Sequence, residues 1–98
     1  MTINTALNGT ELTVSLSGRL DTSTAPQLET ELKATLSGVE RLILDLAALE
    51  YLSSAGLRVI LFAQKTMNKQ GEMIVTNANE NILEIFDITG FADILTLA

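Results

Sequence analysis

Residues 41–57 read RLILDLAALEYLSSAGL, and this stretch decides the fold. Its first six residues, 41–46, are a short apolar run of the kind that is typical of a buried strand. Residues 47–53 mix polar and apolar side chains and are predicted to be a connection. The pattern from residue 54 to about residue 69 is helical, and Gly71 is predicted to end that helix. The stretch therefore predicts a strand, a loop and a helix in succession, which is the building unit of α/β folds.

Further along the chain, the sequence predicts a strand, a short helix and a last strand. Residues 72–76 (EMIVT) are a second short apolar run, and the polar residues 77–81 are typical of a turn. Apolar residues at helical spacing in 82–86 predict a short amphipathic helix that stops before Gly90. Residues 94–97 are expected to form the last strand.

Before residue 41, the sequence predicts a hairpin. Residues 2–7 are expected to be a strand, and Asn8-Gly9 follows it, a dipeptide that tolerates positive φ and favours a tight turn. Residues 11–17 then alternate apolar residues with Thr or Ser, which is typical of a half-buried antiparallel strand. Residues 18–21 (GRLD) are expected to end that strand.

The first helix is predicted to start at Thr24. Thr24 can cap the helix, Gln27 can return the capping bond, and Pro26 is tolerated in a first turn. Apolar residues then recur every four positions, at Leu28, Leu32 and Leu36. Helices between successive strands imply parallel crossovers, so the fold class is α/β, with a mixed β-sheet in the order β-β-α-β-α-β-α-β and helices packed on it.

The composition fits one small domain and excludes several chemistries. With 98 residues, of which 47 % are hydrophobic, the chain can build a single core and is expected to be one domain over residues 1–98. It contains no Cys and no His, which excludes disulfides, thiolate chemistry and imidazole metal sites, and removes the commonest general base. No metal and no cofactor are therefore predicted.

The charge pattern predicts a soluble cytoplasmic protein. The net charge is −6, and the six Lys and Arg residues are scattered along the chain, which disfavours nucleic acid and anionic membranes as partners. The most apolar stretch, residues 56–63, is far shorter than the roughly 18 residues that span a bilayer. The N-terminal residues lack the basic start and apolar core of a secretory signal. Nothing suggests an obligate dimer, so the free protein is expected to be a monomer.

Two loops are candidates for a functional site. One follows the strand 11–17 and the other follows the strand 41–46. Because these strands are predicted to be parallel, both loops are expected at the same edge of the sheet, where sites form in open α/β sheets. Asp21 in the first loop is either a turn residue or a carboxylate near the Ser54 hydroxyl, and Tyr51 in the second is either core or a binding anchor.

Ser53 and Ser54 stand at the start of the second helix. One Ser is sufficient as an N-cap, because its side-chain oxygen accepts a free backbone N–H, so the second leaves an accessible hydroxyl. Gly56 lies inside the helix, where it costs on the order of 1 kcal/mol against Ala, so it indicates either close helix–sheet packing or close approach by a partner. Arg58, four residues after Ser54, is either a solvated charge or a partner for an anion at Ser54.

The chain resembles the anti-sigma-factor antagonist family, the compact STAS domain, in three segments. Residues 16–21 (LSGRLD) resemble the G-x-L-D that follows the family's second strand. Residues 44–46 (LDL) with 51–60 (YLSSAGLRVI) resemble its phosphorylation loop and the following helix, and this is the most specific match. Residues 71–75 (GEMIV) and 85–91 (IFDITGF) resemble its remaining strand and helix.

The resemblance implies a STAS-like fold and a switch at Ser54. In the family, the phosphorylated serine aligns with Ser54, and the Asp that usually precedes it is Ser53 here, which makes Ser53 a second, weaker candidate acceptor. The resemblance implies that the unmodified protein binds an anti-sigma factor serine kinase, that phosphorylation ends the complex, and that a PP2C-like phosphatase resets it. The residues expected to meet the partner or to take part in the switch are Asp21, Thr22, Ser23, Tyr51, Leu52, Ser53, Ala55, Gly56 and Arg58.

Three other functional classes compete with this one. An enzyme is disfavoured, because a serine nucleophile needs a neighbouring base and Lys65 lies roughly 16 Å along the helix from Ser54. A nucleotide-binding module is disfavoured, because no G-x-x-x-x-G-K-[ST] loop is present. A STAS adaptor in a different signalling or transport assembly stays open, because a fold does not determine its client.

Overall fold

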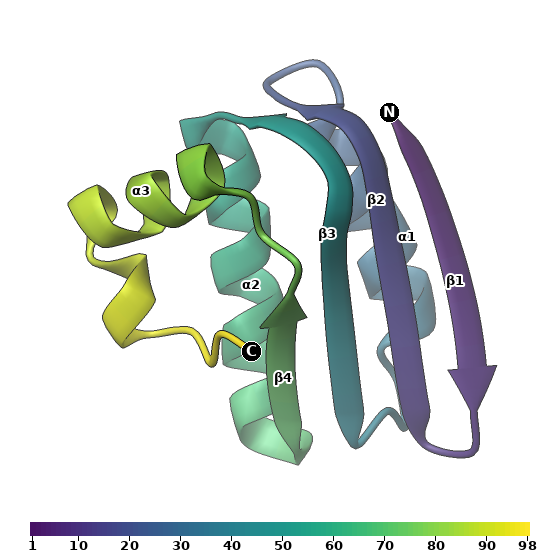
Figure 1. Ribbon diagram of the computed structural model, residues 1–98. Helices are drawn as coiled ribbons and strands as arrows, with labels where there is room; N and C mark the ends of the chain where they lie inside the picture. The colour runs from purple at the N-terminus through teal and green to yellow at the C-terminus, as the bar shows by residue number, and fades with distance from the viewer.

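In the computed structural model, which describes residues 1–98, the longest strand is β3 (Arg41–Leu52). It pairs in parallel with β2 (Glu11–Leu20) on one side and with β4 (Glu72–Thr76) on the other. Strand β1 (Thr2–Asn8) pairs antiparallel with β2, which gives the sheet order β1-β2-β3-β4 (Figure 1). The predicted hairpin at Asn8-Gly9 and the predicted parallel crossovers are confirmed.

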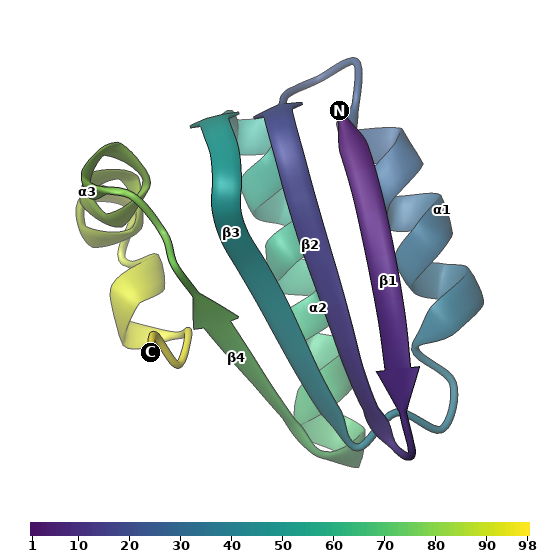
Figure 2. The ribbon, with the colours of Figure 1, turned by 45° about the vertical axis from the view of Figure 1, so that its right-hand side comes forward.

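The helices α1 (Ala25–Thr35) and α2 (Ser54–Gln70) cover one face of this sheet (Figure 2). The apolar residues of the alternating strands point to that face, so that Leu12, Val14 and Leu16 of β2 are all buried. Ser and Thr residues occupy the alternate positions of β2 and are only half buried. The core therefore lies between the sheet and the two helices.

The third helix, α3 (Glu80–Thr89), lies beyond β4 and covers that end of the sheet (Figure 1). Asn79 caps it, since its side-chain oxygen accepts the backbone N–H of Ile82 at 3.0 Å. It ends at Gly90, whose φ of 81° is left-handed, as glycine allows. None of the helices has both the length and the apolar character that a membrane span requires.

Two strands extend beyond their predicted ends. Residues 47–53 were expected to be a connection, but β3 continues through Leu52, and β2 continues past the predicted break to Leu20. The pairing of β2 with β3 shifts register after Ser15 and again after Gly18. Each shift is a local irregularity of the bulge type, beyond which the two strands pair again. These shifts interrupt the alternation of side chains in β3, which is why periodicity did not predict the extension.

The last strand is shorter than predicted. A 3₁₀ turn, η1 (Phe91–Asp93), follows α3, and the chain then forms a single parallel bridge between Leu97 and Val75 of β4. The backbone N–H of Val75 donates to the carbonyl of Thr96 at 2.9 Å, and the N–H of Ala98 donates to the carbonyl of Val75 at 2.9 Å. This contact covers the outer edge of β4.

Candidate functional site

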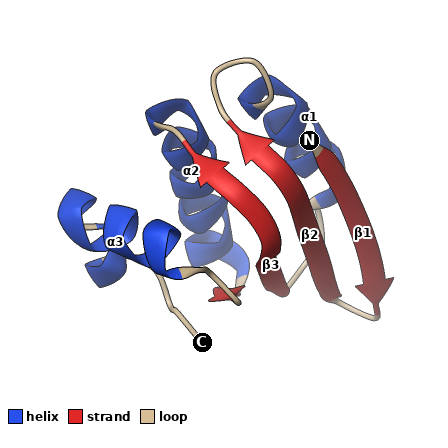
Figure 3. Cartoon of the chain, turned by 45° about the horizontal axis from the view of Figure 1, so that its top comes forward, coloured by secondary structure: helices blue, strands red, loops and turns tan.

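The ends of β2 and β3 lie side by side, and each leads into the N-terminus of a helix (Figure 3). The last pair in the parallel register is Leu20 with Leu52, and the backbone N–H of Ser53 donates to the carbonyl of Leu20 at 2.9 Å. The expectation that both loops open at one edge of the sheet is confirmed. The start of α2 is thereby fixed to the end of β2.

Ser53 and Ser54 have different structural roles. Ser53 is the N-cap of α2, with extended backbone (φ −98°, ψ 174°), and its side chain accepts the backbone N–H of Gly56 at 3.4 Å. Ser54 is the first residue of the helix and is exposed. Because Ser53 supplies the cap, the Ser54 hydroxyl lies at the helix N-terminus and makes no hydrogen bond within the protein.

Asp21 forms the centre of a hydrogen-bonded turn. Its carboxylate accepts the Ser23 hydroxyl at 2.7 Å, the Ser23 backbone N–H at 3.0 Å and the Thr24 backbone N–H at 3.2 Å. The hydrogen bond from the Ser23 side chain is the main reason why the pKa of Asp21 lies below its usual range. The reading of Asp21 as a turn residue is therefore confirmed, and its hydrogen bonds lie within its own loop, none of them to Ser54.

The predicted capping box at α1 is wrong. Thr24 does occupy the N-cap position, but its side chain makes no capping hydrogen bond to the helix. Its hydroxyl instead donates to the carbonyl of Arg19 at 2.8 Å and accepts the backbone N–H of Asp21 at 2.9 Å. Because the Thr24 hydroxyl is hydrogen-bonded within the loop that contains Asp21, it does not cap the backbone N–H groups of α1.

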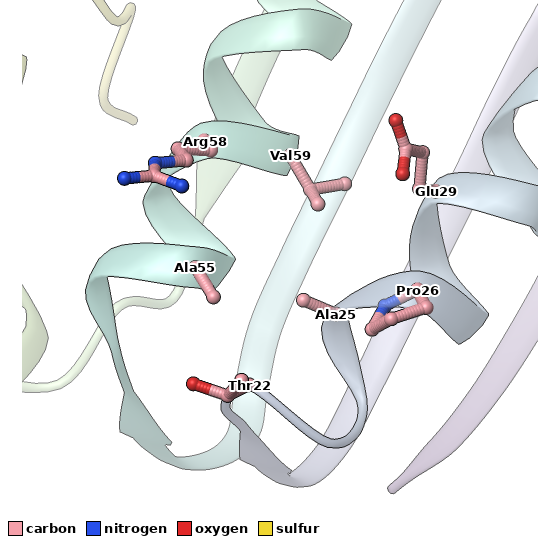
Figure 4. Close-up of a pocket in the computed structure, with 7 residues that line it drawn as sticks. All are labelled: Thr22, Ala25, Pro26, Glu29, Ala55, Arg58 and Val59. Atoms are coloured by element: carbon pink, nitrogen blue, oxygen red, sulfur yellow. The ribbon is translucent and has the colours of Figure 1, made fainter.

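A groove of about 250 Å³ lies between the N-terminal turns of α1 and α2 (Figure 4). Its apolar lining comes mainly from Ala25, Ala55 and Val59, and the predicted site residue Thr22 lies at one end. Arg58 also lines it, but its guanidinium points away from α1 in Figure 4. The groove brings together Thr22 of the first predicted loop and the predicted site residues Ala55 and Arg58, which belong to α2.

Tyr51 and Arg19 form a pair on the surface next to Ser53. The guanidinium carbon of Arg19 lies 4.1 Å from the centroid of the Tyr51 ring, which is the geometry of a cation–π contact. Tyr51 is 41 % exposed, so it is not a core residue, and its role as a binding anchor stays a prediction. The sequence analysis did not name Arg19 as a site residue. Parallel pairing of β2 with β3 places Arg19 opposite Tyr51, but this pairing follows a register shift between Gly18 and Arg19, which the sequence alone does not reveal.

Leu52 and Gly56 are buried and shape the site from beneath. A Cβ atom on Gly56 would lie 2.7 Å from Leu20 Cγ and 2.7 Å from Leu52 Cδ1. Of the two explanations for this glycine, close packing of the helix on the sheet is therefore the one that the structure supports. Leu52 and Gly56 were both predicted to meet the partner, but both are buried, so they support the site from the core and do not present a side chain to a partner.

The surface around Ser54 combines several groups that can contact a partner. No three Cys, His, Asp or Glu residues are grouped so that they could hold a metal ion. The exposed groups at this edge include the hydroxyls of Ser54 and Thr22, one aromatic ring with its cation, and the groove between the two helices. Ser54 contributes an exposed hydroxyl at the first position of α2.

Comparison with known proteins agrees with this geometry. The chain is 41 % identical over 85 residues to BtrV of Bordetella bronchiseptica, whose name assigns it to the anti-sigma factor antagonists, covering 85 % of this chain and 73 % of BtrV. It is 30 % identical over 92 residues to the anti-sigma-B factor antagonist of Bacillus subtilis, covering 93 % of this chain and 84 % of the relative.

The fold matches solved structures as well. An anti-sigma factor antagonist from Mycobacterium paratuberculosis superposes with a TM-score of 0.89 at 27 % identity, covering 98 % of this chain and 83 % of that one. Phosphorylated SpoIIAA of Bacillus shares the fold with a TM-score of 0.78 at 17 % identity, covering 99 % and 91 % of the two chains. The family model of the STAS domain matches residues 2–98. This chain belongs to the STAS domain family.

Proposed function

We propose that this protein is a cytoplasmic anti-sigma factor antagonist that works by partner switching. The unphosphorylated form binds an anti-sigma factor serine kinase, and phosphorylation of Ser54 by that kinase ends the complex. A PP2C-like phosphatase removes the phosphate and restores binding. In this scheme the protein is a regulated binding partner and not an enzyme.

One observation carries the proposal: Ser54 is an exposed hydroxyl at the first position of α2, while its neighbour Ser53 supplies the N-cap. A kinase can modify Ser54 without removing the cap. Ser53 is the weaker acceptor, because phosphorylation there would change the oxygen that accepts the Gly56 N–H. The relatives named as antagonists support the assignment of the binding activity.

The physical chemistry of the position favours a switch without unfolding. A phosphoserine carries about −1.5 to −2 charges at neutral pH. The N-terminus of a helix stabilises such a group by roughly 0.3–1 kcal/mol, because its free N–H groups and its dipole favour negative charge. The folded domain therefore tolerates the phosphate.

At a protein interface the same phosphate is unfavourable. A partner surface that is complementary to a neutral hydroxyl offers no positive charge to the phosphate. Binding would therefore remove water from the dianion without compensation, which costs several kcal/mol. About 3 kcal/mol already lowers affinity more than a hundredfold. The carboxylate of Asp21 in the neighbouring loop adds negative charge on the same edge of the sheet. Loss of binding, rather than a change of fold, is the expected consequence.

The test is phosphorylation by the cognate anti-sigma factor serine kinase. After incubation with that kinase and ATP, intact mass should show one phosphate, and peptide mapping should place it on Ser54. The Ser53→Ala variant should still be phosphorylated and Ser54→Ala should not. Phosphate on Ser53 or elsewhere contradicts the proposed switch, and stable binding without phosphorylation indicates a STAS adaptor instead.

A further inference from the structure

The cations of this protein fall into two groups. Arg19, Lys33 and Arg41 each form an ion pair with at least one carboxylate of the chain. Arg58, Lys65 and Lys69 form none, and all three belong to α2. Helix α2 contains no Asp or Glu, so its charge is +3, and the three remaining cations and twelve carboxylates leave the rest of the chain at −9.

The three unpaired cations line one groove. It has a volume of about 400 Å³, and its other lining residues are Leu61, Phe62 and Thr66. Positions 58, 62, 65 and 69 follow one another at steps of four, three and four, so they form a single stripe on the helix. The stripe runs from Arg58 to Lys69, a distance of about 16 Å along the helix axis. The three cations are exposed, and Leu61 and Phe62 are half buried between them.

The usual structural explanation for a helical cation accounts for only one of the three. Lys69 lies in the last turn of α2, where a positive charge is favoured by the helix dipole. Arg58 and Lys65 lie in the first half and the middle of the helix, where this effect is absent. A positive stripe around two apolar side chains, in a strongly acidic protein, requires another explanation.

We infer that this stripe, residues 58–69 of α2, binds an acidic amphipathic segment of the partner kinase, and that it extends the contact which begins at Ser54. The inference rests on the proposed function. Carboxylates of the partner meet Arg58, Lys65 and Lys69, and an apolar side chain packs between Leu61 and Phe62. Arg58 connects the stripe with the surface around Ser54, because it lines both this groove and the groove between the N-terminal turns of α1 and α2.

Charge complementarity favours an acidic protein over the other possible occupants. Nucleic acid and anionic membranes also attract cations, but three charges are few for such a surface, and the −9 of the remaining chain repels both. The apolar residues in the groove fit a protein side chain. A second copy of this chain is acidic as well, so self-association is measured separately.

The experiment compares four proteins in binding to the cognate anti-sigma factor serine kinase, at low and high ionic strength. They are the wild type, Ser54→Asp, the double variant Lys65→Gln/Lys69→Gln, and Asn8→Asp/Asn81→Asp. The last two have the same net charge, because each lowers it by two, but only one of them alters the stripe. Circular dichroism and thermal unfolding establish that all four are folded.

The stripe variant should bind the kinase about tenfold more weakly than the charge-matched control at low ionic strength, and the difference should shrink at high ionic strength. Equal binding of the two double variants overturns the inference while leaving the Ser54 switch intact. Wild-type affinity of Ser54→Asp contradicts the switch alone. Absence of wild-type binding rejects both.

Three further measurements decide between the kinase and the other occupants. The wild type and the Lys65→Gln/Lys69→Gln variant are each mixed with a DNA duplex and with vesicles that contain phosphatidylglycerol, and the mass of each protein is followed by light scattering as concentration rises. None of these should show an interaction that depends on Lys65 and Lys69. Such an interaction, together with unchanged kinase binding, assigns the stripe to another occupant and overturns the inference.

Discussion

The backbone N–H of Ser53 donates a 2.9 Å hydrogen bond to the carbonyl oxygen of Leu20, which joins the start of α2 to the end of β2. This bond determines where the helix begins, and therefore which of the two serines becomes the cap. Ser53 is held in extended conformation and turns its oxygen toward the Gly56 N–H, while Ser54 enters the first turn. The identity of the free hydroxyl thus follows from the pairing of the sheet.

The first prediction separates the two serines by stability. Ser53→Ala should lower the free energy of unfolding by about 0.5–1 kcal/mol, because the cap is lost and its 3.4 Å hydrogen bond is long. Ser54→Ala should change it by less than about 0.5 kcal/mol, since an exposed residue at the first helical position has no cap to lose. Urea unfolding of the two variants measures the difference. Equal losses contradict the assignment of Ser53 as the sole cap.

The second prediction concerns binding. Ser54→Ala should remain bound to the partner kinase in the presence of ATP, because no phosphate can be added at this position. Ser54→Asp should bind about tenfold more weakly or worse, because a carboxylate brings one negative charge to the interface, fewer than a phosphate. Titration calorimetry measures both affinities. Ser53→Asp is the control, and its effect should be smaller because aspartate is itself a good N-cap.

The third prediction concerns the packing of α2 on the sheet. Gly56→Ala should destabilise the domain by about 1–3 kcal/mol, although alanine is the better helix former, because the added methyl overlaps Leu20 and Leu52. Combining it with Leu20→Ala should cost less than the sum of the two single variants, since trimming Leu20 makes room for the methyl. Additive losses in urea unfolding would show that the overlap is not the cause.

The fourth prediction concerns the pH dependence of the Asp21 turn. Its pKa lies below the ordinary value of 3.8 in the folded protein, mainly because of the Ser23 hydroxyl. The ionised carboxylate therefore stabilises the fold above pH 3.8, and this contribution is lost as the pH falls through the lower, folded-state pKa. Asp21→Asn should thus be less stable than wild type at neutral pH, and the difference should disappear at low pH.

Urea unfolding of wild type and Asp21→Asn over a series of pH values measures this dependence. The Ser23→Ala variant provides the matched control, because it removes the hydrogen bond that lowers the pKa most. The Asp21 pKa, followed by NMR titration, should move up toward its ordinary value in that variant. An unchanged value would show that the backbone N–H groups alone set it.

Much of the fold was predictable because its signals are local. Alternation in residues 11–17, the Asn8-Gly9 dipeptide and the helical spacing of Leu28 and Leu32 each depend on neighbours along the chain. The ends of β2 and β3 were not predictable in this way. Their last residues pair across two register shifts, and such a pairing is set by the partner strand and not by the residues themselves.

The functional site shows the same division. The sequence by itself determined that the loop with Asp21 and the loop that leads to Ser53 and Ser54 meet at one sheet edge. It also determined that one of the two serines is left over after capping, because one N-cap needs only one of them. Only the tertiary structure decided that Ser54 is the free hydroxyl, that Thr24 holds the Asp21 turn, and that Arg19 covers Tyr51. Two of these features depend on contacts between β2 and β3, which are distant in sequence. The third depends on which hydrogen-bond partner the Thr24 hydroxyl takes, and the folded loop decides that.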